Sequence, residues 1–204
     1  MSVRRLAAVL AVTVPLAAGC GSTSVFGAKS KSTSSTTQPA TTPAATSTRA
    51  RPATVTSIDG SFETIVPTGF VDATRSVRSG VANVQYLAIG QRTKGFATNI
   101  NVIREPAQGR TDIDQITNLE VATIKRIDAR ADRFSQPSAI TVGGDRARAV
   151  DYYNRPTGQR LLHQRQVFIA HNQWIYTITY SALPDAYAAH VGAVDQVAAG
   201  WKWL

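Results

Sequence analysis

The stretch from residue 21 to residue 57 contains almost no large apolar side chain, and this gap most limits what the chain can fold into. Nearly half of its residues are Ser or Thr, mixed with three prolines. Such a composition cannot bury enough apolar surface to offset the entropy of ordering it. We therefore expect residues 20–57 to form a disordered tether and residues 58–204 to form one globular domain. About 147 residues are enough to bury a core without disulfide bonds or metal ions.

The only cysteine of the chain, Cys20, directly follows a short apolar segment. Arg4 and Arg5 precede an apolar stretch over residues 6–18. That stretch is shorter than the roughly 20 residues that a membrane-spanning helix needs, so it indicates a signal peptide. The small residues before Cys20 resemble the bacterial lipobox, although Ala17 stands where leucine is usual.

This resemblance implies a lipoprotein signal peptide over residues 1–19, removed before Cys20, and a lipid on the cysteine thiol. The protein would then lie outside the cytoplasm, anchored to the bacterial cell membrane. The alternative is an ordinary secreted protein whose cysteine lies near its cleavage site by chance. In either case a lone cysteine forms no disulfide bond within the chain and leaves no catalytic thiol in the domain.

The net charge of +9 suggests a nucleic-acid-binding protein only if the charge is concentrated in the domain. From residue 58 onward the chain has 16 Lys or Arg against 13 Asp or Glu, a net charge of +3. These residues are interleaved, whereas a phosphate-binding groove gathers positive charge on one face. The composition therefore excludes nucleic acid as the partner.

Local patterns divide the domain into strands and helices. Alternating side chains predict strands over 61–66, 84–89, 97–104, 139–142, 146–153, 161–170 and 174–181. Apolar residues at helical spacing predict a helix over 111–131 and a second one that begins near Pro184. Gly143 and Gly144 lie between two strands and predict a tight hairpin.

This order predicts an α+β fold: a largely antiparallel sheet of about seven strands with two main helices packed on it. We expect Thr111 to cap the first helix and the carboxylates of Asp112 and Asp114 to stabilise its first turn. An acid–base pair formed by Asp112 and Asp114 is the alternative, and capping explains both residues more simply.

Several segments resemble the PsbP-like superfamily, and among its members the actinobacterial lipoproteins of LpqN type. They are residues 62–70, the Asn99–Val102 strand, the Gly143-Gly144 hairpin, the Trp174–Tyr180 strand and the ending Trp201-Lys202-Trp203. The resemblance covers residues 60–203 and implies an antiparallel sheet flanked by helices. It implies no shared enzymatic activity, because members are mostly accessory or binding proteins.

No catalytic or cofactor motif is present in the sequence: there is no G-x-S-x-G, no phosphate-binding P-loop and no H-E-x-x-H. The three histidines have no acidic companions at metal-ligand spacing, so we expect no metal, no cofactor and no catalytic residue. A His163–Asp151 pair across neighbouring strands is conceivable, but no nucleophile is placed to use it.

Aromatic side chains provide the candidate binding surface. Trp174, Tyr176 and Tyr180 share one face of a strand, with Tyr152 or Tyr153 on a nearby strand. On an uncovered face of the sheet they would form an apolar patch for a ligand or partner. The alternative is that they belong to the core, under the final helix.

Three functions follow. The first is a lipid-anchored envelope protein whose domain is a non-catalytic binding or accessory module for an envelope protein, a peptide or an apolar ligand. The second is an envelope hydrolase acting on lipid or cell-wall substrate, which requires a serine, a histidine and a carboxylate to converge. The third is a structural stabiliser of a membrane complex.

Overall fold

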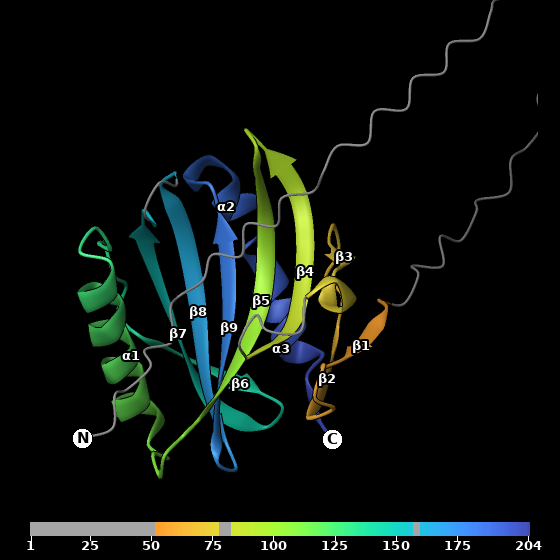
Figure 1. The fold of residues 1–204 in the computed structure, drawn as a ribbon, viewed down its shortest axis with the longest axis vertical. Coiled ribbons are helices and arrows are strands. Elements are labelled where there is room, and N and C mark those ends of the chain that lie inside the picture. Colours follow the sequence, from red (N-terminus) through yellow and green to blue (C-terminus); the bar gives the residue numbers. More distant parts are fainter. Residues whose placement is uncertain (1–51, 78–82, 157–159) are drawn as a thin grey trace, which may run out of the picture. The chain divides into compact units, whose positions relative to one another are not determined.

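The computed structural model describes residues 52–77, 83–156 and 160–204 (Figure 1). The predicted signal peptide, Cys20 and most of the predicted tether lie outside these residues. The strands are β1 (Thr54–Thr56), β2 (Phe62–Ile65), β3 (Val71–Asp72), β4 (Val84–Thr93), β5 (Phe96–Pro106), β6 (Ser138–Val142), β7 (Asp145–Asn154), β8 (Leu162–His171), β9 (Trp174–Ala182) and β10 (Lys202–Trp203). The helices are α1 (Ile113–Ile127), α2 (Pro184–His190) and α3 (Gly192–Ala199), with a 3₁₀ turn η1 (Thr74–Ser76).

Seven strands form one antiparallel sheet in the order β3–β4–β5–β9–β8–β7–β6. After β5 the chain passes through α1 and three further strands before β9 returns beside β5, where Tyr180 pairs with Ile100. The expected α+β fold with a seven-stranded antiparallel sheet is confirmed. The strands that make up this sheet differ from the predicted set in one place: β3 belongs to the sheet and β2, which was predicted as its first strand, does not.

A second, three-stranded sheet has the order β1–β2–β10 and joins both ends of the domain. In this sheet Trp203 pairs with Phe62, and the ring of Trp201 stacks on Phe62 with 3.8 Å between ring centroids. Strand β1 lies within residues 20–57, which the sequence assigned to the tether. The fold therefore begins before residue 58, because β2 offers a free edge with which β1 pairs.

The two faces of the large sheet are covered differently (Figure 1). One face packs against α2, α3 and the small sheet, and its core includes Ile100 and Ile178 from the sheet with Val194 and Val197 from α3. On the other face α1 packs over β7 and β8. The rest of that second face, along β8, β9 and β5, carries amide and hydroxyl side chains: Gln164, Gln166, Thr177, Thr179, Ser181, Asn99 and Asn101.

Both helices differ in detail from the prediction. Helix α1 begins at Ile113, and its N-cap is Asp112, whose Oδ1 accepts hydrogen bonds from the backbone N–H of Asp114 at 2.9 Å and of Gln115 at 3.4 Å. Thr111 is therefore not the cap. The final helix is divided into α2 and α3 around Val191.

The predicted hairpin at Gly143 and Gly144 joins β6 to β7. Both glycines have positive φ, +57° and +91°, which is unfavourable for residues with a side chain. A Cβ at Gly143 would also lie 2.7 Å from Trp201 Cδ1 and from Trp203 Nε1. Gly143 is thus required both by the turn and by the tryptophans packed against it.

Candidate functional site

Three of the four predicted aromatic site residues lie in the core. Tyr176 and Tyr180 are 2% and 0% exposed and face α2, α3 and the small sheet. Tyr152 is 0% exposed on the opposite face, where its ring stacks on Phe134 with 5.0 Å between centroids. Of the two alternatives given for these tyrosines, burial in the core is the one that the structure shows. The expectation of an exposed patch is wrong for them, because other aromatic side chains cover each ring: those of the small sheet and Trp201 on Tyr176, Tyr187 of α2 on Tyr180, and Phe134 on Tyr152.

Trp174 keeps part of its surface accessible. Its ring lies under the guanidinium of Arg104, with 4.0 Å from the guanidinium carbon to the ring centroid. Arg104 in turn forms an ion pair with Asp59. Trp174 is therefore held at the boundary of the core and is separate from the pocket described next.

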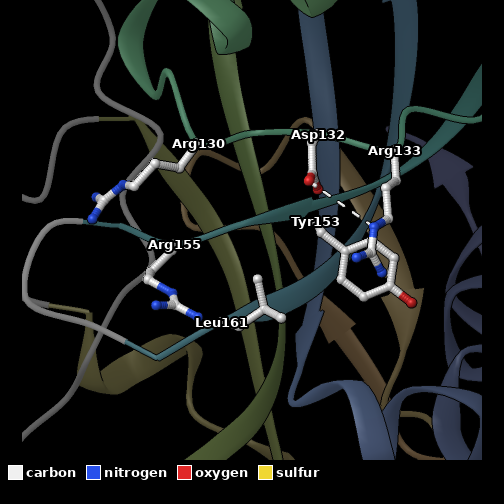
Figure 2. A pocket seen from close by; sticks show the side chains of 6 residues that line it. All are labelled: Arg130, Asp132, Arg133, Tyr153, Arg155 and Leu161. Carbon is white, nitrogen blue, oxygen red and sulfur yellow. Dashed lines mark ion pairs between the residues drawn. The ribbon is translucent and has the colours of Figure 1, made fainter.

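A pocket of about 310 Å³ lies where the segment after α1 crosses the end of β7. Figure 2 shows the side chains that line it: Arg130, Asp132, Arg133, Tyr153, Arg155 and Leu161. Asp132 forms a single antiparallel bridge with Tyr153, so this segment continues the sheet edge beyond β6. Arg130 and Arg155 extend to the same side of the pocket, while Arg133 folds over the ring of Tyr153 (Figure 2).

The carboxylate of Asp128 connects the two chain segments that carry Arg130 and Arg155. Its Oδ1 accepts the backbone N–H of Arg130 at 3.0 Å and contacts Nε of the same residue at 3.4 Å. Its Oδ2 accepts the backbone N–H of Arg155 at 3.2 Å. A carboxylate at a helix C-terminus is unfavourable for the helix dipole, and these three contacts offset that cost.

Tyr153 joins the pocket to a column of stacked rings inside the domain. The guanidinium carbon of Arg133 lies 5.0 Å from the Tyr153 ring centroid. The imidazole of His163 stacks on Tyr153 at 4.1 Å and on Tyr187 at 3.4 Å. The hydroxyl of Tyr187 donates a hydrogen bond to the carboxylate of Asp151. One wall of the pocket is thus supported by β7, β8 and α2 together.

Known structures share this architecture at low sequence identity. The cyanobacterial PsbP protein of Synechocystis superposes with a TM-score of 0.54 at 13% identity, covering 74% of this chain and 92% of that one. The domain has the PsbP-like fold. LpqN of Mycobacterium tuberculosis, a protein involved in cell envelope biogenesis, gives a TM-score of 0.53 at 16% identity, with 76% and 86% of the two chains covered.

The yeast Ran-binding protein Mog1p has the same fold, with a TM-score of 0.52 at 12% identity over 75% of this chain and 95% of its own. No family model and no curated sequence matches the chain. The fold expected from the sequence resemblance is therefore confirmed. Because these PsbP-like domains have different described roles, the fold by itself does not assign one.

The titratable groups of the column in this PsbP-like domain are shifted by burial. Burial lowers the pKa of His163, and the nearby Asp151 carboxylate opposes that shift. Burial raises the pKa of Tyr187, and its hydrogen bond to Asp151 raises it further. The imidazole is therefore held neutral and the phenol protonated around neutral pH.

The His163–Asp151 pair considered from the sequence does not form. In the register of β7 and β8, His163 lies opposite Tyr153 and Asp151 lies opposite Arg165. The imidazole is covered on both sides by phenol rings, and the carboxylate accepts the Tyr187 hydroxyl. The arrangement fastens α2 to the sheet of the PsbP-like domain.

Two features are absent from residues 52–77, 83–156 and 160–204, which the structure describes. No three His, Cys, Asp or Glu side chains within these ranges are grouped so that they could hold a metal ion. Within the same ranges, no helix has the length and apolar character needed to cross a membrane.

Of the pocket residues, the sequence pointed to Tyr153 as an alternative to Tyr152 and did not indicate the three arginines. Arg130 lies in the last turn of the first predicted helix, Arg133 follows that helix, and Arg155 lies in the predicted loop after the strand over 146–153. Basic residues near the end of the predicted helix and in the loop after the strand were the available signal. Nothing in the linear pattern indicated that these two segments meet.

Proposed function

We propose that this chain is a lipid-anchored protein of the bacterial cell envelope whose PsbP-like domain is a non-catalytic binding or accessory module. The anchor is supported by the apolar leader that ends in small residues at Cys20. The envelope location is supported by the fold shared with LpqN, which is described as involved in cell envelope biogenesis.

The observation that carries the binding role is the pocket beside Tyr153. Binding sites combine a hollow of roughly 300 Å³ or more with a few convergent polar groups and apolar walls. The pocket has this combination, with three guanidinium groups, the Tyr153 ring and the Leu161 side chain. The hydrolase alternative called for His163 to contact a carboxylate, and the nearby Asp151 carboxylate instead accepts the hydroxyl of Tyr187.

The proposed tether places this module away from the lipid surface. The ordered strands begin at Thr54, so more than thirty residues separate the first strand from Cys20. A flexible segment of that length has a root-mean-square span of roughly 30 Å. The domain would then reach partners beyond the headgroup layer while it remains attached to the membrane.

Labelling with an alkyne-bearing fatty acid tests the anchor. Expressed in a bacterial host, the wild-type chain should incorporate the label and fractionate with membranes. The Cys20→Ala variant should incorporate none. A mature wild-type chain that carries no label would contradict the anchor.

A pull-down in mild detergent tests the module. Wild type and Cys20→Ala are each compared with Arg133→Gln, in the pocket, and Trp174→Ala, at the predicted aromatic surface. Partners captured by wild type and by Cys20→Ala place recognition in the domain, and the variant that loses them identifies the surface. Partners that are captured by every chain carrying Cys20, including Arg133→Gln and Trp174→Ala, and lost only with Cys20→Ala would contradict a binding role for the domain.

A further inference from the structure

The side chains that line the pocket carry an excess of positive charge. Arg130, Arg133 and Arg155 provide three guanidinium groups, and Asp132 provides the single carboxylate. Asp132 is only loosely paired, with 4.0 Å between its Oδ2 and Nε of Arg133. The lining therefore has a formal charge of +2.

One further carboxylate lies beside the pocket: Oδ1 of Asp128 is 3.4 Å from Nε of Arg130, which reduces the local excess to one positive charge. All 13 Asp and Glu residues belong to residues 59–195, and each lies within the described ranges. Among these described residues, no ion pair involves the guanidinium of Arg155. Arg130 contacts Asp128 through Nε, and its guanidinium forms no second ion pair with a described residue.

The backbone that carries two of the pocket arginines is fixed before any ligand arrives. Asp128 holds the backbone of Arg130 and Arg155 at fixed positions. Arg133 is held on Tyr153, which is itself part of the stacked column. Arginines whose positions are set in advance lose less entropy when they bind an anion than arginines on a mobile surface.

Guanidinium groups bind phosphate through pairs of parallel hydrogen bonds. A phosphate monoester near neutral pH has a charge close to −2, opposite in sign to the net positive charge around the pocket. The Tyr153 ring and the Leu161 side chain leave an apolar wall for the organic part of the ester. A volume of about 310 Å³ accommodates a phosphate with a small organic group attached.

We propose that Arg130, Arg133 and Arg155 form a binding site for the phosphate group of a phosphate monoester. This proposal rests on the binding role proposed above and names the chemistry of its ligand. The same group is present in an anionic lipid headgroup and in a soluble ester. The site recognises the phosphate in both cases, and the experiment distinguishes the two sources.

The experiment uses the full chain with Cys20→Ala, so that no lipid anchor contributes to binding. The soluble probe is glycerol 3-phosphate, titrated calorimetrically against sodium chloride of equal ionic strength. The membrane probe is a vesicle of equal parts phosphatidylcholine and phosphatidic acid, sedimented beside vesicles of phosphatidylcholine alone. The expected result is binding of glycerol 3-phosphate, of the phosphatidic acid vesicles, or of both, beyond the chloride and phosphatidylcholine controls.

Variants separate the pocket from general electrostatic attraction. Arg133→Gln and Arg155→Gln should each weaken binding about tenfold or more, because each removes charged hydrogen bonds to the phosphate. Arg146→Gln removes the same charge near the opposite end of β7, where the side chain is 78% exposed, and should leave binding nearly unchanged. Thermal unfolding of each variant confirms that the domain is intact.

Binding of the soluble ester alone would identify a soluble ligand, and binding of the vesicles alone would identify a headgroup. Binding of neither probe would overturn the proposal, and so would equal weakening by Arg146→Gln and Arg155→Gln. The proposed function would remain supported after that failure if wild type incorporates the fatty-acid label and the pull-down captures partners through the domain. Phosphate binding by the domain, together with a wild-type chain that incorporates no fatty-acid label, would instead contradict the anchor alone.

Discussion

The ring of His163 lies flat against the ring of Tyr187, with 3.4 Å between ring centroids and 15° between ring planes. His163 belongs to β8 and Tyr187 to α2, so this contact joins the end of the chain to the sheet. Tyr153 stacks on the imidazole as well and must cover its other face. The column therefore connects the packing of α2 with the wall of the arginine pocket.

Because burial lowers the pKa of His163, stability should depend on pH. The unfolded chain titrates near the ordinary value of 6.5 and binds the proton more readily than the folded chain. The free energy of unfolding should therefore be highest above that value and fall as the pH decreases toward the lowered folded pKa. Urea unfolding at about pH 8 and about pH 5 measures the change. His163→Gln should lose less stability across this interval than wild type, and an equal loss would contradict the assignment to His163.

Tyr187→Phe should destabilise the domain by about 1–3 kcal/mol, because it removes the hydroxyl that donates to the half-buried Asp151 carboxylate. Tyr153→Phe is the matched control. Tyr153 belongs to the same column, and its hydroxyl donates no hydrogen bond to a described residue. Denaturant unfolding measures both variants, and equal effects would show that the Tyr187 hydroxyl contributes nothing specific.

Gly143→Ala should cost about 1–3 kcal/mol more than Gly144→Ala. Both substitutions place a side chain at positive φ, so the strain of the backbone is largely common to them. Only at Gly143 would the new Cβ collide with Trp201 and Trp203, since nothing lies within 4 Å of a Cβ at Gly144. Thermal unfolding midpoints test the difference, and a larger loss for Gly144→Ala would reverse the interpretation.

Asp112→Ala should lower stability by about 1 kcal/mol through loss of the α1 N-cap. Thr111→Ala removes the residue that the sequence favoured as the cap and should have little effect. Denaturant unfolding of the two variants compares them directly. A greater loss for Thr111→Ala would restore the cap to that residue.

The strands were predictable from the sequence where large and polar side chains alternate clearly between neighbouring residues. In β9 the large side chains Tyr176 and Tyr180 alternate with Thr177 and Thr179, and the structure places the two sets on opposite faces. The residues predicted as the first strand do form β2, but its sheet was not predictable. Its partner β10 lies at the far end of the chain, and no local pattern encodes such a pairing.

The end of the first helix was also not predictable, because contacts with a distant strand set it. Apolar spacing extended the predicted helix to residue 131, whereas α1 ends at Ile127. The residues that follow turn away because Asp128 bonds to Arg130 and Arg155, and because Asp132 pairs with Tyr153. These contacts with β7 outweigh the weak helical preference of the segment.

The sequence by itself determined the α+β class, the order of most elements and the Gly143-Gly144 hairpin, because strand, helix and turn preferences act between neighbouring residues. The tertiary structure alone decided that Tyr176 and Tyr180 belong to the core, and that Arg130, Arg133 and Arg155 surround one pocket. Burial and convergence depend on which surfaces pack together after the chain has folded. A linear pattern gives the faces of each element but not the partners that cover them.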